Sequence, residues 1–151
     1  MAYQRILVSV DLTEEADEVI SAASNIAKSQ NAVMHSVTVV KPLARVYGGL
    51  DMAPITSGAI AFEKEAIEQA GHQLRELGGE YGVPDANSHV RLGSPPAEIR
   101  ALAEELGIDL IVIGTHGRHG LGLLLGSTAN AVLHGVTCDV LAVKIHPVVV
   151  S

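Results

Sequence analysis

Cysteine is almost absent from this chain, because Cys138 is the one cysteine among 151 residues. A single thiol excludes an internal disulfide framework, the usual support of small secreted domains. No charged segment followed by an apolar leader opens the sequence, so a cytoplasmic location is expected. Cys138 stands between Thr137 and an apolar run at 140–143, where we expect a buried structural thiol rather than a nucleophile.

Aromatic residues, basic residues and long apolar runs are also scarce. Aromatic side chains make up 3% of the chain, so the core must be built from Val, Ile, Leu and Ala, as in helix-covered parallel sheets. No apolar run approaches the roughly 20 residues of a membrane-spanning helix, so no membrane association is expected. The net charge is −7 and the ten Lys and Arg residues are scattered, which argues against binding of DNA or RNA.

The remaining composition, 48% hydrophobic and 18% charged, predicts one globular domain over residues 1–151. Strand-like apolar runs alternate with helical periodicity, which predicts an α/β fold with a doubly wound, parallel five-stranded sheet and helices on both faces. The predicted strands are 5–10, 32–40, 87–92, 110–113 and 139–145. The predicted helices are 14–30, 59–77, 97–106 and 128–133, with a long surface loop at 41–58. Strand 87–92 is the least apolar and is expected at a sheet edge.

Three helix starts carry residues suited to capping. Thr13 is predicted to cap the first helix. Ser94 is a candidate cap ahead of Pro95-Pro96, since proline fits a first helical turn. Ser127 and Thr128 are placed to cap the helix after the fourth strand.

The most informative stretch is 109–128, DLIVIGTHGRHGLGLLLGST, where the apolar run stops at Gly114. Four further glycines and a Ser-Thr pair follow: Gly117, Gly120, Gly122, Gly126, Ser127 and Thr128. In open α/β sheets, ligands bind at the carboxyl ends of the strands. Glycines let backbone amides approach an anion, and the two hydroxyls can bind phosphate, so we interpret the stretch as a phosphate cradle. The alternative is a tight loop that needs glycine only for positive φ.

No catalytic constellation is visible in the sequence. A Walker-type Gly-Lys-Ser or Gly-Lys-Thr is absent, and so is a Gly-x-Ser-x-Gly elbow. Efficient ATP hydrolysis needs a positioned water and charge clamps beyond a binding loop, so at most slow hydrolysis is expected. The seven histidines form no pair at metal-ligand spacing on one helix, and no metal site is predicted.

Five segments together carry a resemblance to a known family. They are Val8-Ser9-Val10-Asp11, Gly93-Ser94-Pro95-Pro96-Ala97-Glu98-Ile99, 109–117, Gly126-Ser127 and 138–143. Over essentially its whole length the chain resembles the universal stress protein family. The resemblance implies a sheet in the order 3-2-1-4-5 and a homodimer, often formed through the last strand. The apolar segments 140–143 and 148–150 fit such an interface, since they leave an edge and a tail that need cover.

Some members of that family bind ATP and others do not. The binders carry Gly-x-x-Gly, nine residues, and then Gly-Ser or Gly-Thr. Here Gly114-Thr115-His116-Gly117 and Gly126-Ser127 match the two halves, but residues 118–125 between them number eight. The shorter spacing resembles the non-binding subgroup, whereas the retained glycines and Ser127 favour an anion site. On balance we predict that ATP, ADP or AMP binds, with Mg²⁺ carried by the phosphates.

The resemblance also implies roles for single residues. Asp11 would lie near the ribose or the metal, and Val39 would lie beside the adenine and act through its backbone. The strongest candidates for the phosphates are Gly114, Gly117, Gly126, Ser127 and Thr128, with His116 and Arg118 as sources of positive charge. The alternatives are a helix-capping carboxylate for Asp11, core packing for Val39 and solvated loop side chains for His116 and Arg118.

Three functions are compatible with these observations. The first is a homodimeric stress-response regulator whose ATP occupancy biases the interaction with a protein partner. The second is a ligand-free dimer that acts only through protein contacts, with the loop 41–58 as its variable surface. The third, and least favoured, is a hydrolase that uses the same crevice.

Overall fold

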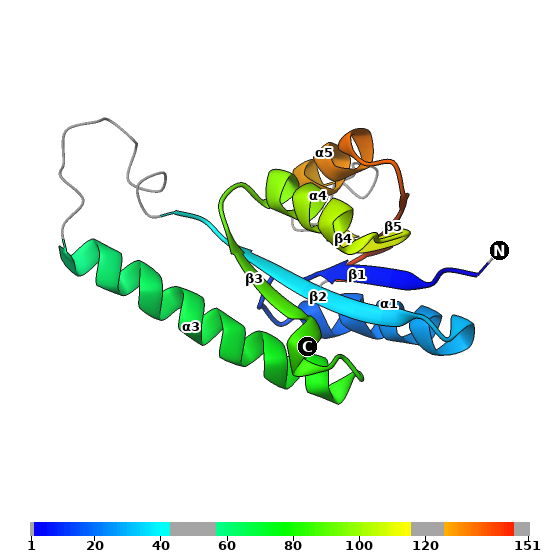
Figure 1. The fold of residues 1–151 in the computed structure, drawn as a ribbon, viewed down its shortest axis with the longest axis horizontal. Coiled ribbons are helices and arrows are strands. Elements are labelled where there is room, and N and C mark those ends of the chain that lie inside the picture. The colour runs from blue at the N-terminus through cyan, green and yellow to red at the C-terminus, as the bar shows by residue number, and fades with distance from the viewer. Residues whose placement is uncertain (1, 43–56, 116–125, 147–151) are drawn as a thin grey trace.

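The computed structural model describes residues 2–42, 57–115 and 126–146. They form a five-stranded parallel sheet in the order β3-β2-β1-β4-β5, which confirms the predicted fold and strand order (Figure 1). The strands are β1 (Arg5–Ser9), β2 (Val33–Val40), β3 (Ser88–Leu92), β4 (Leu110–Thr115) and β5 (Asp139–Lys144). Strands β3 and β5 form the two edges of the sheet, so β3 has the edge position that its sequence predicts.

Helices cover both faces of the sheet. They are α1 (Ala16–Gln30), α3 (Ser57–Glu80), α4 (Pro95–Leu106) and α5 (Ser127–Gly135), with a short 3₁₀ helix, η1 (Asp85–Asn87), before β3. In Figure 1, α1 and α3 lie on one side of the sheet, and α4 and α5 lie on the other. One apolar cluster joins α1 and α3 to the sheet, and a second joins α4 and α5 to it.

The central strand β1 contributes side chains to both clusters. Ile6 and Val8 pack toward α1 and α3, whereas Leu7 packs toward α4 and α5, and all three are fully buried. A strand covered on both faces needs apolar residues at every position, which explains the continuous apolar run. Strand β4 follows the same rule, because Val112 and Ile111 belong to opposite clusters. Strands β1 and β4, between which the order of the strands reverses, are therefore the most deeply buried strands.

Two of the three predicted helix caps are wrong, and the third is confirmed in position. The N-cap of α1 is Glu15 rather than Thr13, and it makes no side-chain capping bond. Thr13 Oγ1 instead accepts a hydrogen bond from the Glu15 amide at 3.4 Å, because a hydroxyl can close a tight turn two residues ahead. Gly126 is the N-cap of α5, so Ser127 is already helical. Ser94 is the N-cap of α4, as predicted, although its side chain makes no capping bond.

Helix α3 extends beyond its predicted range at both ends. It starts at Ser57, inside the loop predicted at 41–58, while residues 43–56 lie outside the described residues. Gly78, directly after the predicted range 59–77, is helical and buried. A Cβ at this position would lie 3.1 Å from the Cβ of Val83. Packing therefore explains that glycine. Among the described helices, none combines the length and apolarity needed to cross a membrane.

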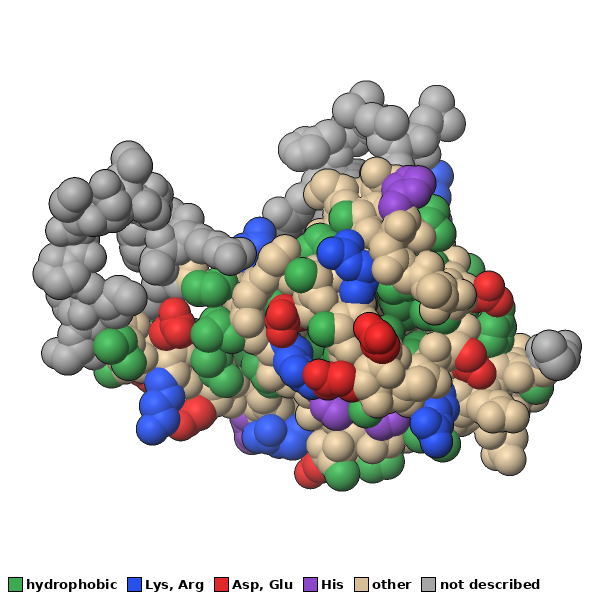
Figure 2. All heavy atoms as spheres, turned by 45° about the horizontal axis from the view of Figure 1, so that its top comes forward, with side chains coloured by type: hydrophobic (Ala, Val, Ile, Leu, Met, Phe, Trp, Pro, Cys, Tyr) green, Lys and Arg blue, Asp and Glu red, His purple; other side chains and the backbone are tan. Residues whose placement is uncertain are grey.

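Charged side chains are mixed on the surface that Figure 2 shows. Lys and Arg residues alternate there with Asp and Glu and do not gather into a basic patch. This distribution agrees with the scattered basic residues of the sequence.

Candidate functional site

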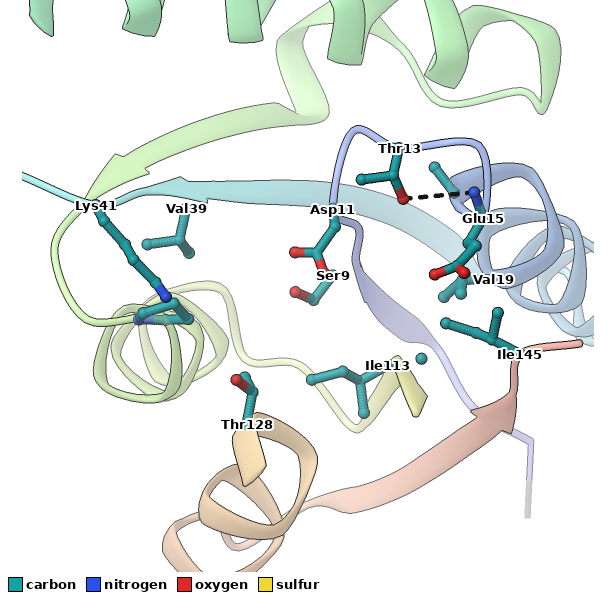
Figure 3. A pocket seen from close by; sticks show the side chains of 13 residues that line it. Ser9, Asp11, Thr13, Glu15, Val19, Val39, Lys41, Ile113, Thr128 and Ile145 are labelled. Atoms are coloured by element: carbon teal, nitrogen blue, oxygen red, sulfur yellow. Dashed lines mark hydrogen bonds between the residues drawn. The ribbon is translucent and has the colours of Figure 1, made fainter. Parts of the chain in front are cut away.

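A pocket lies at the carboxyl edge of the sheet, between the ends of β1 and β4. The chain leads from β1 to β2 on one side, whereas β4 lies on the other side, so the strand order reverses here. We call this cavity of about 150 Å³ the switch-point pocket (Figure 3). Its lining residues are Ser9, Asp11, Thr13, Glu15, Ala16, Val19, Val39, Lys41, Pro95, Ile113, Gly114, Thr128 and Ile145.

Four of the residues predicted from the sequence meet in this pocket. Asp11 follows β1, Val39 lies in β2, Gly114 lies in β4 and Thr128 lies in the first turn of α5. These residues are far apart in the sequence and come together because parallel strands all end at the same edge. Figure 3 shows the Asp11 carboxylate beside Ser9 and on the side that faces Val39.

The other predicted residues lie next to the pocket or outside the described chain. Ser127 lines a neighbouring cavity, and Gly126 precedes it as the N-cap of α5. His116, Gly117 and Arg118 lie outside the described residues, so their roles stay predictions.

Gly114 is required by packing rather than by backbone conformation. A Cβ at this position would lie 2.7 Å from Ile145 Cδ1 and 2.8 Å from Val19 Cγ2, far closer than ordinary contact. Positive φ, the alternative explanation for these glycines, is absent at Gly114, and Gly126 has φ of −57°. Gly114 therefore allows Val19 of α1 and Ile145 at the end of β5 to pack directly against β4.

Ile145, the residue directly after β5, forms the wall next to Gly114 and is 6% exposed. Its neighbour His146 bonds to Glu18 of α1 twice, through its amide at 3.1 Å and through Nδ1 at 2.5 Å. These hydrogen bonds from His146 hold the pKa of the Glu18 carboxyl below its ordinary value. The end of β5 is thus fastened to α1 beside the pocket.

The charges in the pocket are unevenly placed. Asp11 and Glu15 contribute carboxylates, and Lys41 contributes an ammonium group. In Figure 3, Lys41 extends into the side of the pocket near Val39 and Thr128, across from Glu15. The sequence reading missed Lys41 by placing it in a long loop. Its position two residues after Val39, at the end of a strand, was the signal that it belongs to the ligand-binding edge.

A second cavity of about 540 Å³ adjoins the switch-point pocket. It is lined by Lys41, Pro42, Gly93, Ser94, Pro95, Pro96, Ser127 and Thr128. The two cavities share Lys41, Pro95 and Thr128, so we treat them as one groove over the starts of α4 and α5. The second cavity is lined by hydroxyls and an ammonium group, without a carboxylate among its described residues.

A histidine pair that the sequence reading missed lies on β2 and β3. His35 Nδ1 and His89 Nε2 are 3.1 Å apart, and the two rings stack with centroids 5.3 Å apart. Burial lowers the pKa of both rings. The charges of His89 and then Arg5 lower the pKa of His35 further, and the charge of Arg91 lowers that of His89 further. A search for pairs on one helix cannot detect two histidines that parallel strands bring together. Within the described residues, no group of three or more His, Cys, Asp or Glu could hold a metal ion.

Cys138 is half-buried rather than buried as predicted, and it packs against the apolar cluster under α4 and α5. Its thiol is free and half-buried, and burial raises its pKa. A raised pKa leaves less of the nucleophilic thiolate at neutral pH. We therefore assign no chemistry to it.

Comparison with known proteins identifies the family. The model of the universal stress protein family matches residues 2–144. Universal stress protein A homolog 1 from Coxiella burnetii is 43% identical over 143 residues, covering 95% of this chain and 97% of its own length. The chain belongs to the universal stress protein family.

Solved structures of universal stress proteins share this fold. One, a universal stress protein in complex with cAMP, is 24% identical with a TM-score of 0.67, over 97% of this chain and 100% of that chain. Another, from Archaeoglobus fulgidus in complex with dAMP, is 23% identical with a TM-score of 0.57, over 95% of this chain and 100% of that chain. At these identities the likeness establishes the fold of the universal stress protein family and nothing finer.

Proposed function

We propose that this universal stress protein is a regulatory protein that binds an adenine nucleotide in the switch-point pocket. The observation that carries the proposal is the meeting of Asp11, Val39, Gly114 and Thr128 around one cavity where the strand order reverses. Two solved relatives support it, since one is in complex with cAMP and the other with dAMP. ATP, ADP and AMP are the natural ligands to test.

Each lining residue suits one part of such a ligand. The Asp11 carboxylate accepts hydrogen bonds from the ribose hydroxyls, and the backbone of Val39 recognises the adenine edge beside the apolar side chain of Ile113. Ser127 and Thr128 offer hydroxyls to phosphate, together with amides in the first turn of α5. Gly114 lets Val19 and Ile145 pack against the end of β4, and these two side chains form part of the pocket wall.

A bound Mg²⁺ would be carried mainly by the phosphates. The switch-point pocket offers the two carboxylates Asp11 and Glu15, fewer than the oxygen ligands that Mg²⁺ needs. Phosphate oxygens and water would supply the rest. Efficient hydrolysis would also need a positioned water and charge clamps beyond a binding loop, so occupancy rather than turnover is the proposed signal.

We also propose that the protein is a homodimer joined through β5. This strand is an edge of the sheet, and its Leu141 side chain is 37% exposed. An edge strand carries a row of unpaired backbone N–H and C=O groups that a second copy can satisfy. If the β5 strands of two copies pair about a twofold axis, each strand covers the exposed β5 edge of the other copy.

Isothermal titration calorimetry with AMP, ADP and ATP, each with Mg²⁺, tests the nucleotide proposal. Asp11→Asn should weaken binding about tenfold, because it removes a charged hydrogen-bond acceptor. Asp85→Asn, an exposed change in η1, is the matched control and should bind as the wild type does. Gly126→Val should abolish binding while the fold persists, because φ of −57° suits any residue but the side chain would fill the anion site.

The absence of heat with all three nucleotides up to millimolar concentration would overturn the proposal. That result would favour the alternative, a dimer that acts through protein contacts alone. Retained affinity in Gly126→Val would show that the phosphates bind elsewhere.

A further inference from the structure

Lys41 is the residue that links the two cavities of the groove. It follows β2 directly and lines both the switch-point pocket and its neighbour. Among the described residues that line either cavity, it is the one Lys or Arg. Lys41 takes part in none of the ion pairs found in the described part of the chain. Its ammonium group is therefore available to a ligand.

The opposite end of the groove is acidic. Asp11 and Glu15 line the switch-point pocket on the side of α1, whereas the second cavity has no carboxylate among its described lining residues. Two like charges a few ångströms apart repel each other, so an anionic group is disfavoured next to the carboxylates. The chain as a whole carries a net charge of −7, which makes a local cation more important for an anionic ligand.

The second cavity also has the size and the donors for a chain of phosphates. Its volume is about 540 Å³, against about 150 Å³ for the switch-point pocket. Ser94, Ser127 and Thr128 place hydroxyls around it, at the starts of α4 and α5. The two cavities meet at the three residues that they share, Lys41, Pro95 and Thr128, so a ligand with its nucleoside at Asp11 can extend past them into this space.

We propose that Lys41 contacts the phosphates and makes this site prefer nucleotides with a linear chain of two or three phosphates over the nucleoside and the monophosphate. The inference rests on the proposed nucleotide site and deepens it. The nucleoside occupies the switch-point pocket, and the phosphate chain runs past Lys41 into the second cavity, away from Asp11 and Glu15. Each added phosphate brings more negative charge to the ammonium group, so the contribution of Lys41 grows along the series.

Calorimetry with adenosine, AMP, ADP and ATP on the wild type and on Lys41→Gln tests this inference. The ratio of dissociation constants between variant and wild type should rise along the series, to about tenfold for ATP, since a hydrogen bond to a charged group is lost. Adenosine should bind both proteins equally. Lys41→Arg should restore most of the ATP affinity because it keeps the charge. Lys64→Gln, an exposed lysine of α3 that lines neither cavity, is the control for net charge.

The outcomes separate this inference from the proposal beneath it. Equal ATP affinity in the wild type and Lys41→Gln would overturn the role of Lys41 and leave the nucleotide site standing. An equal loss for adenosine and ATP would also overturn it, since Lys41 would then act on the pocket and not on phosphate. If the wild type binds none of the four ligands, the nucleotide site itself fails. Circular dichroism of each variant confirms that it is folded.

Discussion

Two glycines of this chain have opposite structural environments, although sequence alone treats them alike. At Gly114 a Cβ would contact Ile145 Cδ1 and Val19 Cγ2, whereas at Gly79, in α3, nothing lies within 4 Å. Gly114→Ala should lower the free energy of unfolding by about 1–3 kcal/mol through overpacking. Gly79→Ala should raise it by about 0.5–1 kcal/mol, because alanine favours the helix. Urea unfolding followed by circular dichroism measures both changes.

A second variant makes the packing argument for Gly114 sharper. Ile145→Val removes Cδ1, the closest atom, so it should recover part of the stability that Gly114→Ala loses. Destabilisation by Gly79→Ala as large as that by Gly114→Ala would contradict the explanation.

The His35–His89 pair predicts a pH dependence of stability. The native pKa of both rings is lowered, so below about pH 6.5, the value for an unfolded histidine, the unfolded chain binds more protons than the native state. The free energy of unfolding should therefore fall as the pH drops below about 6.5. His89→Gln should make this fall shallower. Urea unfolding of both proteins at pH 5, 6 and 8 measures the difference, and parallel curves would contradict it.

The residues that sequence reading missed share a physical reason. Lys41 becomes a pocket residue only because β2 ends beside β1, and His35 meets His89 only because β2 pairs with β3. Asp11 and Gly114 were predictable because each directly follows or ends a long apolar run at a strand terminus. Contacts between residues of different strands therefore cannot be predicted from the sequence until the order of the strands is known.

At the scale of elements, strands were easier to predict than helix ends. Every observed strand lies within two residues of its predicted range. For the central strands β1 and β4 the reason is burial on both faces, which demands an unbroken apolar run. Helix starts depend on which of several side chains reaches which amide, and Thr13 closes a turn instead of capping α1. The end of α3 lies beyond its predicted range, because Gly78 is part of the helix and packs closely against Val83.

At the scale of the whole molecule, the two sheet edges differ in their proposed use. Leu141 on β5 is 37% exposed and Leu92 on β3 is 39% exposed, so the two are matched in exposure and side chain. If the dimer forms through β5, Leu141→Lys should convert it to monomers by placing charges at the joint. Leu92→Lys should leave the dimer intact. Light scattering coupled to size-exclusion chromatography gives the mass, and dissociation by Leu92→Lys alone would place the interface at β3.

Ile145 connects the two proposed activities, because it closes the switch-point pocket one residue after the strand proposed to hold the dimer. The bonds between His146 and Glu18 fasten that same point to α1. If nucleotide binding shifts Ile145 and thereby alters dimer affinity, pairing of β5 must alter nucleotide affinity by an equal factor, as reciprocity requires. The apparent nucleotide affinity of this protein would then depend on its own concentration, so dilution would act as an effector.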